Sequence, residues 1–488
     1  MIIKDKGALD MKNLIGNDWK DSSNLNVVEV INPATSSLID TVPNSTVDDV
    51  VLAISLAKNA FSRWEDTTIF ERGEILTKFA KLLKEDKEDL ASVLSEESGK
   101  ALKESLSEID SLYNITISLI ANAKNLYGTM IPNGIENEND KSLQFTTRTP
   151  IGVVGVLLPG VFKLELLAHK VVSALLMGNA VIVKPSRQAP LVVTKIVYML
   201  RQAGVYEGVV QVIHGDGKVV GQAIAMHPDV NLVTFNGTTA NGIRVMNAAS
   251  KNLTKTILGL EGNNAFILCK DGDVDLAVEE AAKGRFYNAG QLNSANKRFI
   301  IHKSLKEEFI NKLIRKIGSV KLGAPNDKDT DLGCLITEDA AKKTEKQVDD
   351  MVAAGAKLVI GGRRSGAFYE PTILSDIDRK MPVALNLNIS GPVLPIIEFE
   401  NLNDAVDIVN DSVYAEGVSV FTRNMKIAFK LAAFIQNGEV VVNGSTVNYV
   451  NEISKEGWKY SGTGKEGLIS SLEEMSKVKT VILKDILD

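Results

Sequence analysis

Few side chains of this 488-residue chain are nucleophiles or metal ligands with neighbours in sequence that would activate them. Cys269 ends the apolar run AFILC, which predicts a small buried hydrophobic residue. Cys334, in DLGCLI, has no histidine or basic residue beside it in sequence that would lower its pKa. The four histidines are scattered along the chain, at His169, His214, His227 and His302. Because zinc ligands cluster at short spacing, no metal site is predicted.

The stretch FYNAGQLNSANKR, residues 286–298, has the setting of a reactive loop but contains no thiol. The amide of Asn293 is not a nucleophile, and the hydroxyl of Ser294 needs an adjacent base before it can attack a carbonyl. No histidine stands in this stretch to act as that base. We therefore expect no activated nucleophile from these residues.

Helices are predicted for most of the N-terminal third of the chain, which must help to position this stretch. Residues 45–63 combine a Ser/Thr cap, early acids and apolar positions at helical spacing, which predicts an amphipathic helix. Residues 69–127 consist mostly of good helix formers, interrupted by Gly73 and Gly99. Residues 128–150 are polar and turn-rich and end in the alternating stretch SLQFTTR, which predicts an exposed hairpin or edge strand.

From residue 151 onward, apolar strand-like runs alternate with helical ones. IGVVGVLLP, LELLAHKVVSALLMG and AVIVKPS follow one another as strand, helix and strand, an order that indicates a parallel α/β sheet. The alternation continues to about residue 240, so this half is predicted to be doubly wound. A second series begins near Lys255 and includes a helix over DVDLAVEEAAKGRFYNAG.

Composition sets the class of protein and its compartment. The 55 basic and 61 acidic side chains leave a net charge of −6 without a long block of one sign, which does not favour nucleic acid as a partner. No apolar run approaches the length of a membrane span, and the first residues have the pattern of neither a signal peptide nor a transit peptide. We expect a cytoplasmic protein of two or three domains with no membrane partner.

Seven motifs of the chain resemble, in the same order, motifs of the aldehyde dehydrogenase superfamily. They are INPAT at residues 31–35, TPIGVVGVLLP at 149–159, ALLMGNAVIVKPS at 174–186, FNGTT at 235–239, FYNAGQ at 286–291, GPVLPI at 391–396 and GWKYSGTGKEG at 457–467. Seven matches in register make the resemblance specific over essentially the entire chain. The run NAGQLNSANKRFIIH is most similar to the succinate-semialdehyde and lactaldehyde dehydrogenase branch.

The resemblance implies an α/β fold with a Rossmann-like dinucleotide-binding domain, an α/β catalytic-type domain and a small β oligomerisation element. The dinucleotide-binding domain would comprise residues 1–127 and 150–254, and the catalytic-type domain residues 255–445. The oligomerisation element would comprise residues 128–149 and 446–488. The resemblance also implies a homo-dimer or tetramer in which strands cross between subunits.

Members of this family attack an aldehyde with a cysteine thiolate, hold the resulting oxyanion with an Asn side chain and a backbone N–H, and activate water with a Glu. By resemblance, the cysteine position falls on Asn293, the Glu position on Gly259 and the Asn position on Val161. None of these side chains can perform the family's step. Packing and turn residues match the family instead, at Gly290, Gln291, Gly391, Pro392, Gly457, Trp458 and Gly462.

Three neighbouring residues are candidates for altered chemistry. On an extended strand, Glu261 would face the same side as Gly259, about 7 Å away. Ser294 adjoins the nucleophile position, and Lys163 replaces the second Pro of the family's P-W-N-F-P pattern near the mouth of the site. We expect solvated or structural roles for Glu261 and Ser294, and a solvated side chain for Lys163.

The resemblance implies that the residues that bind the cofactor are retained in part. Lys184 matches the lysine that hydrogen-bonds the adenosine ribose, and Gly237 with Thr238 matches the loop that meets the pyrophosphate near a helix start. The family Glu that also binds this ribose falls on Arg187, which favours NADP over NAD if it faces a 2′-phosphate. A surface arginine without a ligand is the equal alternative. The cofactor-binding residues predicted in this way are Lys184, Ser186, Arg187, Gly237, Thr238 and Asn388, the last at the position of the Glu that binds the nicotinamide ribose.

Two classes of function follow from this pattern. The first is a pseudoenzyme that uses the fold for assembly, for binding a small molecule or a dinucleotide, or for partnering an active paralogue. The second is an NAD(P)-dependent oxidoreductase of a small aldehyde or semialdehyde, or an enzyme with altered chemistry in the same cleft. A conventional enzyme in a shifted register is disfavoured, because no plausible gap brings Cys269 or Cys334 to the Gly-Gln loop.

Overall fold

The structure, a computed structural model, describes residues 11–132, 134–135, 142–447 and 450–484. The helical prediction for the N-terminal third is confirmed, with four helices: α1 (Val47–Glu65), α2 (Ile69–Glu85), α3 (Lys87–Ser98) and α4 (Leu102–Ala123). The cap of α1 is a capping box between Thr46 and Asp49. Gly99 ends α3 in a left-handed conformation with φ 76°, whereas α2 runs through Gly73 without a break.

Eight strands form the first sheet, and its five central strands are parallel. Across the sheet they are β2 (Asp18–Lys20), β1 (Asn13–Ile15), β9 (Val210–Val212), β8 (Ala180–Lys184), β7 (Val153–Leu157), β10 (Val230–Asn236), β11 (Lys255–Gly259) and β24 (Gly462–Thr463). The helices of this region are α5 (Leu164–Leu167), α6 (Ser173–Leu176), α7 (Leu191–Ala203), α8 (Gln222–Met226) and α9 (Thr239–Ala249). A π-helical stretch, Ala168–Val172, joins α5 to α6, so the helix predicted over this run forms with a widened turn.

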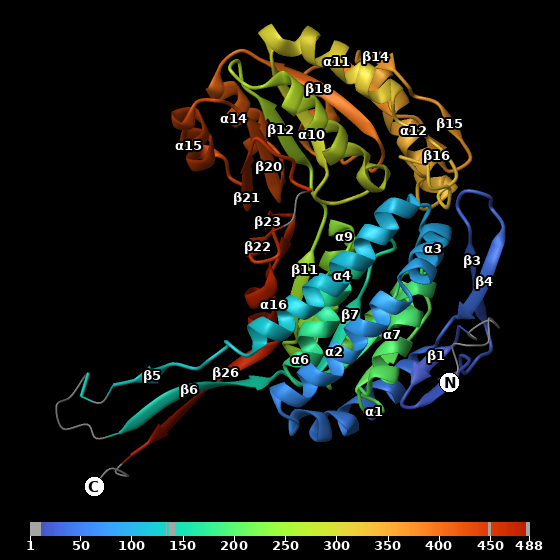
Figure 1. Cartoon of the computed structure of the whole chain (residues 1–488), viewed down its shortest axis with the longest axis vertical. Helices are drawn as coiled ribbons and strands as arrows, with labels where there is room; N and C mark the ends of the chain where they lie inside the picture. The colour runs from blue at the N-terminus through green and yellow to red at the C-terminus, as the bar shows by residue number, and fades with distance from the viewer. Residues whose placement is uncertain (1–10, 133, 136–141, 448–449, 485–488) are drawn as a thin grey trace.

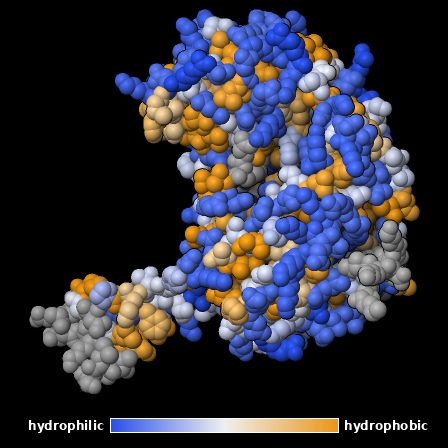
Figure 2. All heavy atoms as spheres, in the orientation of Figure 1, coloured by the Kyte–Doolittle hydropathy of each residue, from blue (hydrophilic) through white to orange (hydrophobic). Residues whose placement is uncertain are grey.

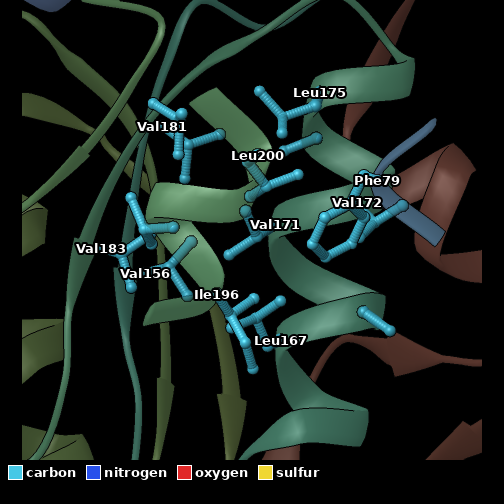
Figure 3. Close-up of a cluster of buried hydrophobic side chains, with 14 of the residues drawn as sticks. Phe79, Val156, Leu167, Val171, Val172, Leu175, Val181, Val183, Ile196 and Leu200 are labelled. Atoms are coloured by element: carbon cyan, nitrogen blue, oxygen red, sulfur yellow. The ribbon is translucent and has the colours of Figure 1, made fainter. Parts of the chain in front are cut away.

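The first sheet is buried on both faces, as the doubly wound prediction requires. Along β8, Val181 and Val183 pack into one core with α2, α4 and α7, whereas Ala180 and Ile182 pack into a second core with α1 and α8. This alternation follows from the two-residue period of a strand. Figure 3 shows the first of these cores, in which side chains of β7 and β8 meet those of α7 and of the α5–α6 segment.

A second, seven-stranded sheet lies beyond β11. Its strands, in order, are β14 (Lys357–Ile360), β17 (Thr372–Ile377), β18 (Val393–Phe399), β13 (Asn296–His302), β12 (Asn264–Leu268), β20 (Gly417–Phe421) and β21 (Glu439–Val442). The accompanying helices are α10 (Val274–Phe286), α11 (Lys306–Gly318), α12 (Glu338–Ala353), α13 (Pro382–Leu385), α14 (Leu402–Asn410) and α15 (Met425–Phe434). The helix predicted through residue 290 ends at Phe286, because Asn288 and Ala289 have φ of 50° and 52°.

A third sheet of three strands extends away from the rest of the molecule (Figure 1). It contains β5 (Met130–Ile131), β6 (Leu143–Pro150) and β26 (Ser476–Leu483), and β26 pairs with β6 along its whole length. The predicted hairpin is confirmed, but the edge-strand alternative is wrong because β6 lies in the middle. Figure 2 shows apolar residues on this projection, where the side chains of Val478 and Ile482 are exposed. Residues 133 and 136–141 of the predicted insert lie outside the described residues.

The remaining elements are short. They are β3 (Val27–Ile31), β4 (Leu38–Pro43), β15 (Arg364–Ser365), β16 (Phe368–Tyr369), β19 (Tyr414–Ala415), β22 (Lys455–Glu456), β23 (Trp458–Lys459), β25 (Lys465–Glu466) and α16 (Leu468–Glu474). Among the described residues, no helix has both the length and the apolar character that a membrane crossing requires.

Candidate functional site

One cavity of about 380 Å³ brings together three positions far apart in sequence. Val161 follows β7, Gly259 ends β11, and Asn293 precedes β13, and all three line this cavity. Val161 and Gly259 thus lie at the carboxyl ends of parallel strands, where open α/β sheets commonly hold ligands. The sequence motifs therefore led to one cleft, whose wall contains the three positions that the resemblance singled out.

The side chain of Asn293 is held by the protein backbone. Its Nδ2 donates a hydrogen bond of 2.7 Å to the carbonyl oxygen of Leu260. The backbone of the adjoining Ser294 is also fixed, because its carbonyl accepts from Asn264 Nδ2 at 3.1 Å and from Thr446 Oγ1 at 2.6 Å. Asn293 therefore ties two segments of the fold together.

The space above Gly259 is filled by Asn236, which the sequence analysis did not single out. The two residues are register partners on the neighbouring parallel strands β10 and β11. A Cβ atom at Gly259 would lie 2.1 Å from Asn236 Nδ2, and this amide donates to Glu466 Oε1 at 3.4 Å. The amide of Asn236 thus occupies the space that a side chain at position 259 would need. In the sequence, the signal for this contact was that the two strands end in FN and LG, which pair in the sheet.

Lys163 is not solvated, so that prediction is wrong. Its side chain is fully buried, and Nζ donates to Glu97 Oε1 and to the carbonyl oxygen of Ala189, both at 2.8 Å. Burial lowers the pKa of Lys163, while the carboxylate of Glu97 opposes this shift. Glu97 also accepts hydrogen bonds from the backbone N–H groups of Leu191 and Val192, so both of its carboxylate oxygens have donors.

Glu261 does not have the extended-strand geometry that would aim it at the base position. β11 ends at Gly259, and the carboxylate lies at the start of α9 instead. Oε2 accepts from the backbone N–H of Thr239 at 3.0 Å, and Oε1 accepts from Asn388 Nδ2 at 3.3 Å. Burial raises the pKa of the nearby Tyr414 hydroxyl, and the charge of Glu261 raises it further.

The residues predicted for the adenosine side lie together at the end of β8. Lys184 is buried, its Nζ donates to the carbonyl oxygen of Pro185 at 3.1 Å, and burial lowers its pKa to about 8. The hydroxyl of Ser186 donates to Gln188. Arg187 is exposed and forms an ion pair with Asp216 at 3.3 Å.

The loop predicted to meet a pyrophosphate does stand at a helix start. Gly237 and Thr238 line the cavity, and Thr238 is the N-cap residue of α9. The side chain of Thr238 makes no capping hydrogen bond, so the acceptor for the Thr239 N–H is the carboxylate of Glu261. Asn388 lines the same cavity.

Glu416 of the cavity wall and its charged neighbour Lys297 were not predicted from the sequence. Glu416 lines the cavity, burial raises its pKa, and its Oε2 has no hydrogen-bond partner. Burial lowers the pKa of Lys297, whose Nζ donates to the carbonyl oxygen of Gly262 at 2.8 Å. In the sequence, the signal for Glu416 was its place as a glutamate inside the strand-like run YAEGVSVF.

Neither cysteine belongs to the cavity wall. Burial raises the pKa of both Cys269 and Cys334 to about 12, as expected for inert thiols. Within the described part of the chain, His, Cys, Asp and Glu side chains form no group of three or more that could hold a metal ion.

Comparison with known proteins places this geometry in a family. Residues 19–481 match the aldehyde dehydrogenase family. The chain belongs to that family.

Named relatives agree with this assignment. A D-glyceraldehyde dehydrogenase (NADP(+)) of Picrophilus torridus is 33% identical over 479 residues, which cover 96% of each chain. A lactaldehyde dehydrogenase of Methanococcus aeolicus is 32% identical and covers 93% of this chain and 97% of its own. The solved structure of betaine aldehyde dehydrogenase from Staphylococcus aureus in complex with NAD+ has a TM-score of 0.94 at 30% identity, over 98% of this chain and 96% of that one.

The fold is therefore that of an aldehyde dehydrogenase, with a Rossmann-like dinucleotide-binding part, an α/β catalytic-type part and a small β element. NADP and NAD are the cofactors named with its relatives. The residues of this chain fit such a dinucleotide on the adenosine side, where Lys184 stands at the end of β8. They do not fit at the two places where the resemblance implies the pyrophosphate and the nicotinamide ribose, because Glu261 already accepts from the first N–H of α9 and from the side chain of Asn388.

Proposed function

We propose that this member of the aldehyde dehydrogenase family does not oxidise aldehydes through a covalent thiol intermediate. The observation that carries the proposal is the hydrogen bond from Asn293 Nδ2 to the carbonyl of Leu260. The nucleophile position holds a non-nucleophilic amide, and that amide already has a partner in the fold. Gly259 would stand at the position of the base and Val161 at the position of the side-chain oxyanion donor, so both groups would also be missing. Losing one such donor costs roughly 10²–10³ in rate.

The candidates for altered chemistry are disfavoured by their contacts. Lys163 is paired with Glu97 outside the cavity wall, and both carboxylate oxygens of Glu261 accept hydrogen bonds from protein donors. Of the histidines, His169 lines the cavity, but its Nδ1 lies 3.1 Å from the hydroxyl of Ser471. Burial lowers the pKa of His169 to about 4.

We propose that the protein uses the family fold as a cytoplasmic binding and assembly scaffold. Its domains would be residues 1–127 with 150–254, residues 255–445, and an oligomerisation element of residues 128–149 and 446–488. The pairing of β26 with β6 supports a homo-dimer or tetramer built through that element, and an active paralogue is a further partner of this kind. Lys184, Ser186, Arg187, Gly237 and Thr238 would form the ligand side of the cleft, with a small molecule or a dinucleotide as ligand.

A turnover assay tests the catalytic part of this proposal. Purified protein is incubated with glyceraldehyde, lactaldehyde or succinate semialdehyde and with NAD+ or NADP+, while nicotinamide absorbance is followed. An active family member serves as the positive control. We expect no reduction of either dinucleotide; turnover that is lost in Asn293→Ala would establish the alternative, an NAD(P)-dependent oxidoreductase with altered chemistry.

A further inference from the structure

The carboxylate of Glu261 bridges two elements that face each other across the cavity. One oxygen accepts the first N–H of α9, from Thr239, at 3.0 Å, and the other accepts from Asn388 Nδ2 at 3.3 Å. Glu261, Thr238 and Asn388 all line the cavity. The carboxylate therefore lies inside the ligand cleft and is bound there by the protein.

These two partners are the groups that a dinucleotide would need. The start of a helix binds anions because its N–H groups lack intrahelical acceptors and carry the positive end of the helix dipole. The resemblance assigns the pyrophosphate to Gly237 and Thr238 at the start of α9, and the nicotinamide ribose to Asn388. A bound diphosphate would have to displace Glu261 from the Thr239 N–H and would be repelled by its charge.

The backbone next to Glu261 is fixed at Leu260, which helps to hold the carboxylate in place. The N–H of Leu260 donates to the carbonyl of Ser461 at 2.9 Å, and the carbonyl of Leu260 accepts from Asn293 at 2.7 Å. On the adenosine side, Lys184 Nζ donates to the neighbouring carbonyl of Pro185, and the carboxylate of Asp216 is paired with Arg187 at 3.3 Å. The two halves of the cleft thus differ in what they offer to a nucleotide.

We propose that Glu261 is an internal anion that excludes the nicotinamide half of a dinucleotide, so that the cleft admits an adenosine phosphate but not the whole cofactor. Glu261 is then a determinant of ligand specificity. The proposal deepens the scaffold function proposed above, because it names adenosine phosphates as the class of ligand. It concerns binding and is tested without any aldehyde.

The test compares whole dinucleotides with their adenosine halves by isothermal titration calorimetry. NADP+ is paired with 2′,5′-ADP, and NAD+ with AMP, on the full chain and on the variants Glu261→Gly and Glu261→Gln. For the unaltered protein we expect each dinucleotide to bind no more than about threefold tighter than its half. Glu261→Gly should bind NADP+ or NAD+ at least tenfold tighter. Its affinity for the half should rise less, because the half brings one 5′-phosphate to the start of α9 and no ribose to Asn388. Glu261→Gln removes the charge but retains the size and should give a smaller gain.

The matched control is Glu456→Gln, because Glu456 lines the same cavity but is exposed. We expect it to leave all four affinities within twofold, and circular dichroism with thermal unfolding checks that each variant is folded. The proposal is overturned if the unaltered protein binds a dinucleotide tenfold tighter than its half, if neither Glu261 variant gains affinity, or if no adenosine half binds to any form. Aldehyde turnover would instead overturn the proposed function, so the two failures are distinguishable.

Discussion

By the resemblance, Lys163 and Asn293 would both replace residues of the family pattern, but their environments differ. Lys163 lies outside the cleft in a buried ion pair with Glu97, whereas Asn293 lines the cleft and donates to the backbone of Leu260. The buried pair keeps two charges away from water, and the cleft amide makes one neutral hydrogen bond. At these two positions, the scaffold thus depends on a strong, buried ion pair, and the cleft on a weaker contact that can be altered singly.

The largest expected effect lies on the scaffold side. Glu97→Ala would leave the ammonium of Lys163 buried without its partner, which should lower the free energy of unfolding by about 3–5 kcal/mol. Urea unfolding followed by circular dichroism measures this change. The matched control is Glu400→Ala, which breaks the exposed pair of Glu400 with Lys303 and should change the free energy by at most about 1 kcal/mol. Equal losses of unfolding free energy in the two variants would show that the buried Lys163–Glu97 pair stabilises the fold no more than an exposed pair.

An intermediate effect is expected where Asn236 covers Gly259. Gly259→Glu places a Cβ against Asn236 Nδ2 and should lower the free energy of unfolding by about 1–3 kcal/mol through overpacking. Because the obstructing atom is the end of a side chain, Asn236→Ala in the same chain should recover most of that loss. A double-mutant cycle in urea gives the coupling between the two positions. Additive effects would mean that the amide does not occupy the space of the missing base.

The pH dependence of stability is a property that the two regions share. Burial lowers the pKa of His214, in the scaffold, to about 3, and that of His169, in the cleft wall, to about 4. The unfolded chain then binds more protons than the folded one below pH 6.5, so stability is full above that pH and falls as the pH decreases. Each histidine should contribute a slope on the order of 1 kcal/mol per pH unit between pH 6.5 and 5.

Urea unfolding at pH 7 and pH 5 measures this slope in the unaltered protein and in His214→Asn. The variant should show a flatter dependence by the contribution of one histidine. His227→Asn is the control, because His227 is only partly buried. An unchanged slope in His214→Asn would contradict a neutral, buried His214.

The smallest effect is expected at the nucleophile position itself. Asn293→Ala removes the hydrogen bond to Leu260 and should lower the free energy of unfolding by about 0.5–1.5 kcal/mol. Asn293→Asp should destabilise more, since a carboxylate cannot donate to the Leu260 carbonyl and repels it. Thermal or urea unfolding distinguishes the two variants. No change in either would show that the amide does not tie the two segments together.

Much of the fold was predictable because its signals are local. The capping box of α1, the helix end at Gly99 and the alternating strands around β8 follow from short-range rules of capping, backbone conformation and two-residue periodicity. Family motifs also located the cleft. The end of α10 was missed, because the sequence does not announce the left-handed backbone of Asn288 and Ala289.

The site was less predictable because its contacts join distant segments. The cover of Asn236 over Gly259 depends on strand register, and the burial of Lys163 depends on a glutamate 66 positions earlier in the chain. The extended strand that would place Glu261 beside Gly259 ends two residues before Glu261. Partners of this kind become visible only when the strands and helices are placed together.

Intact-protein mass spectrometry tests the central claim, that this cleft contains no activated nucleophile, most directly. The protein is incubated with an aldehyde and either dinucleotide, quenched in acid and weighed, with an active family member treated in parallel. The account predicts an unmodified mass for this chain while the active relative carries an acyl group. An acyl adduct mapped to a residue of the cavity wall would contradict it.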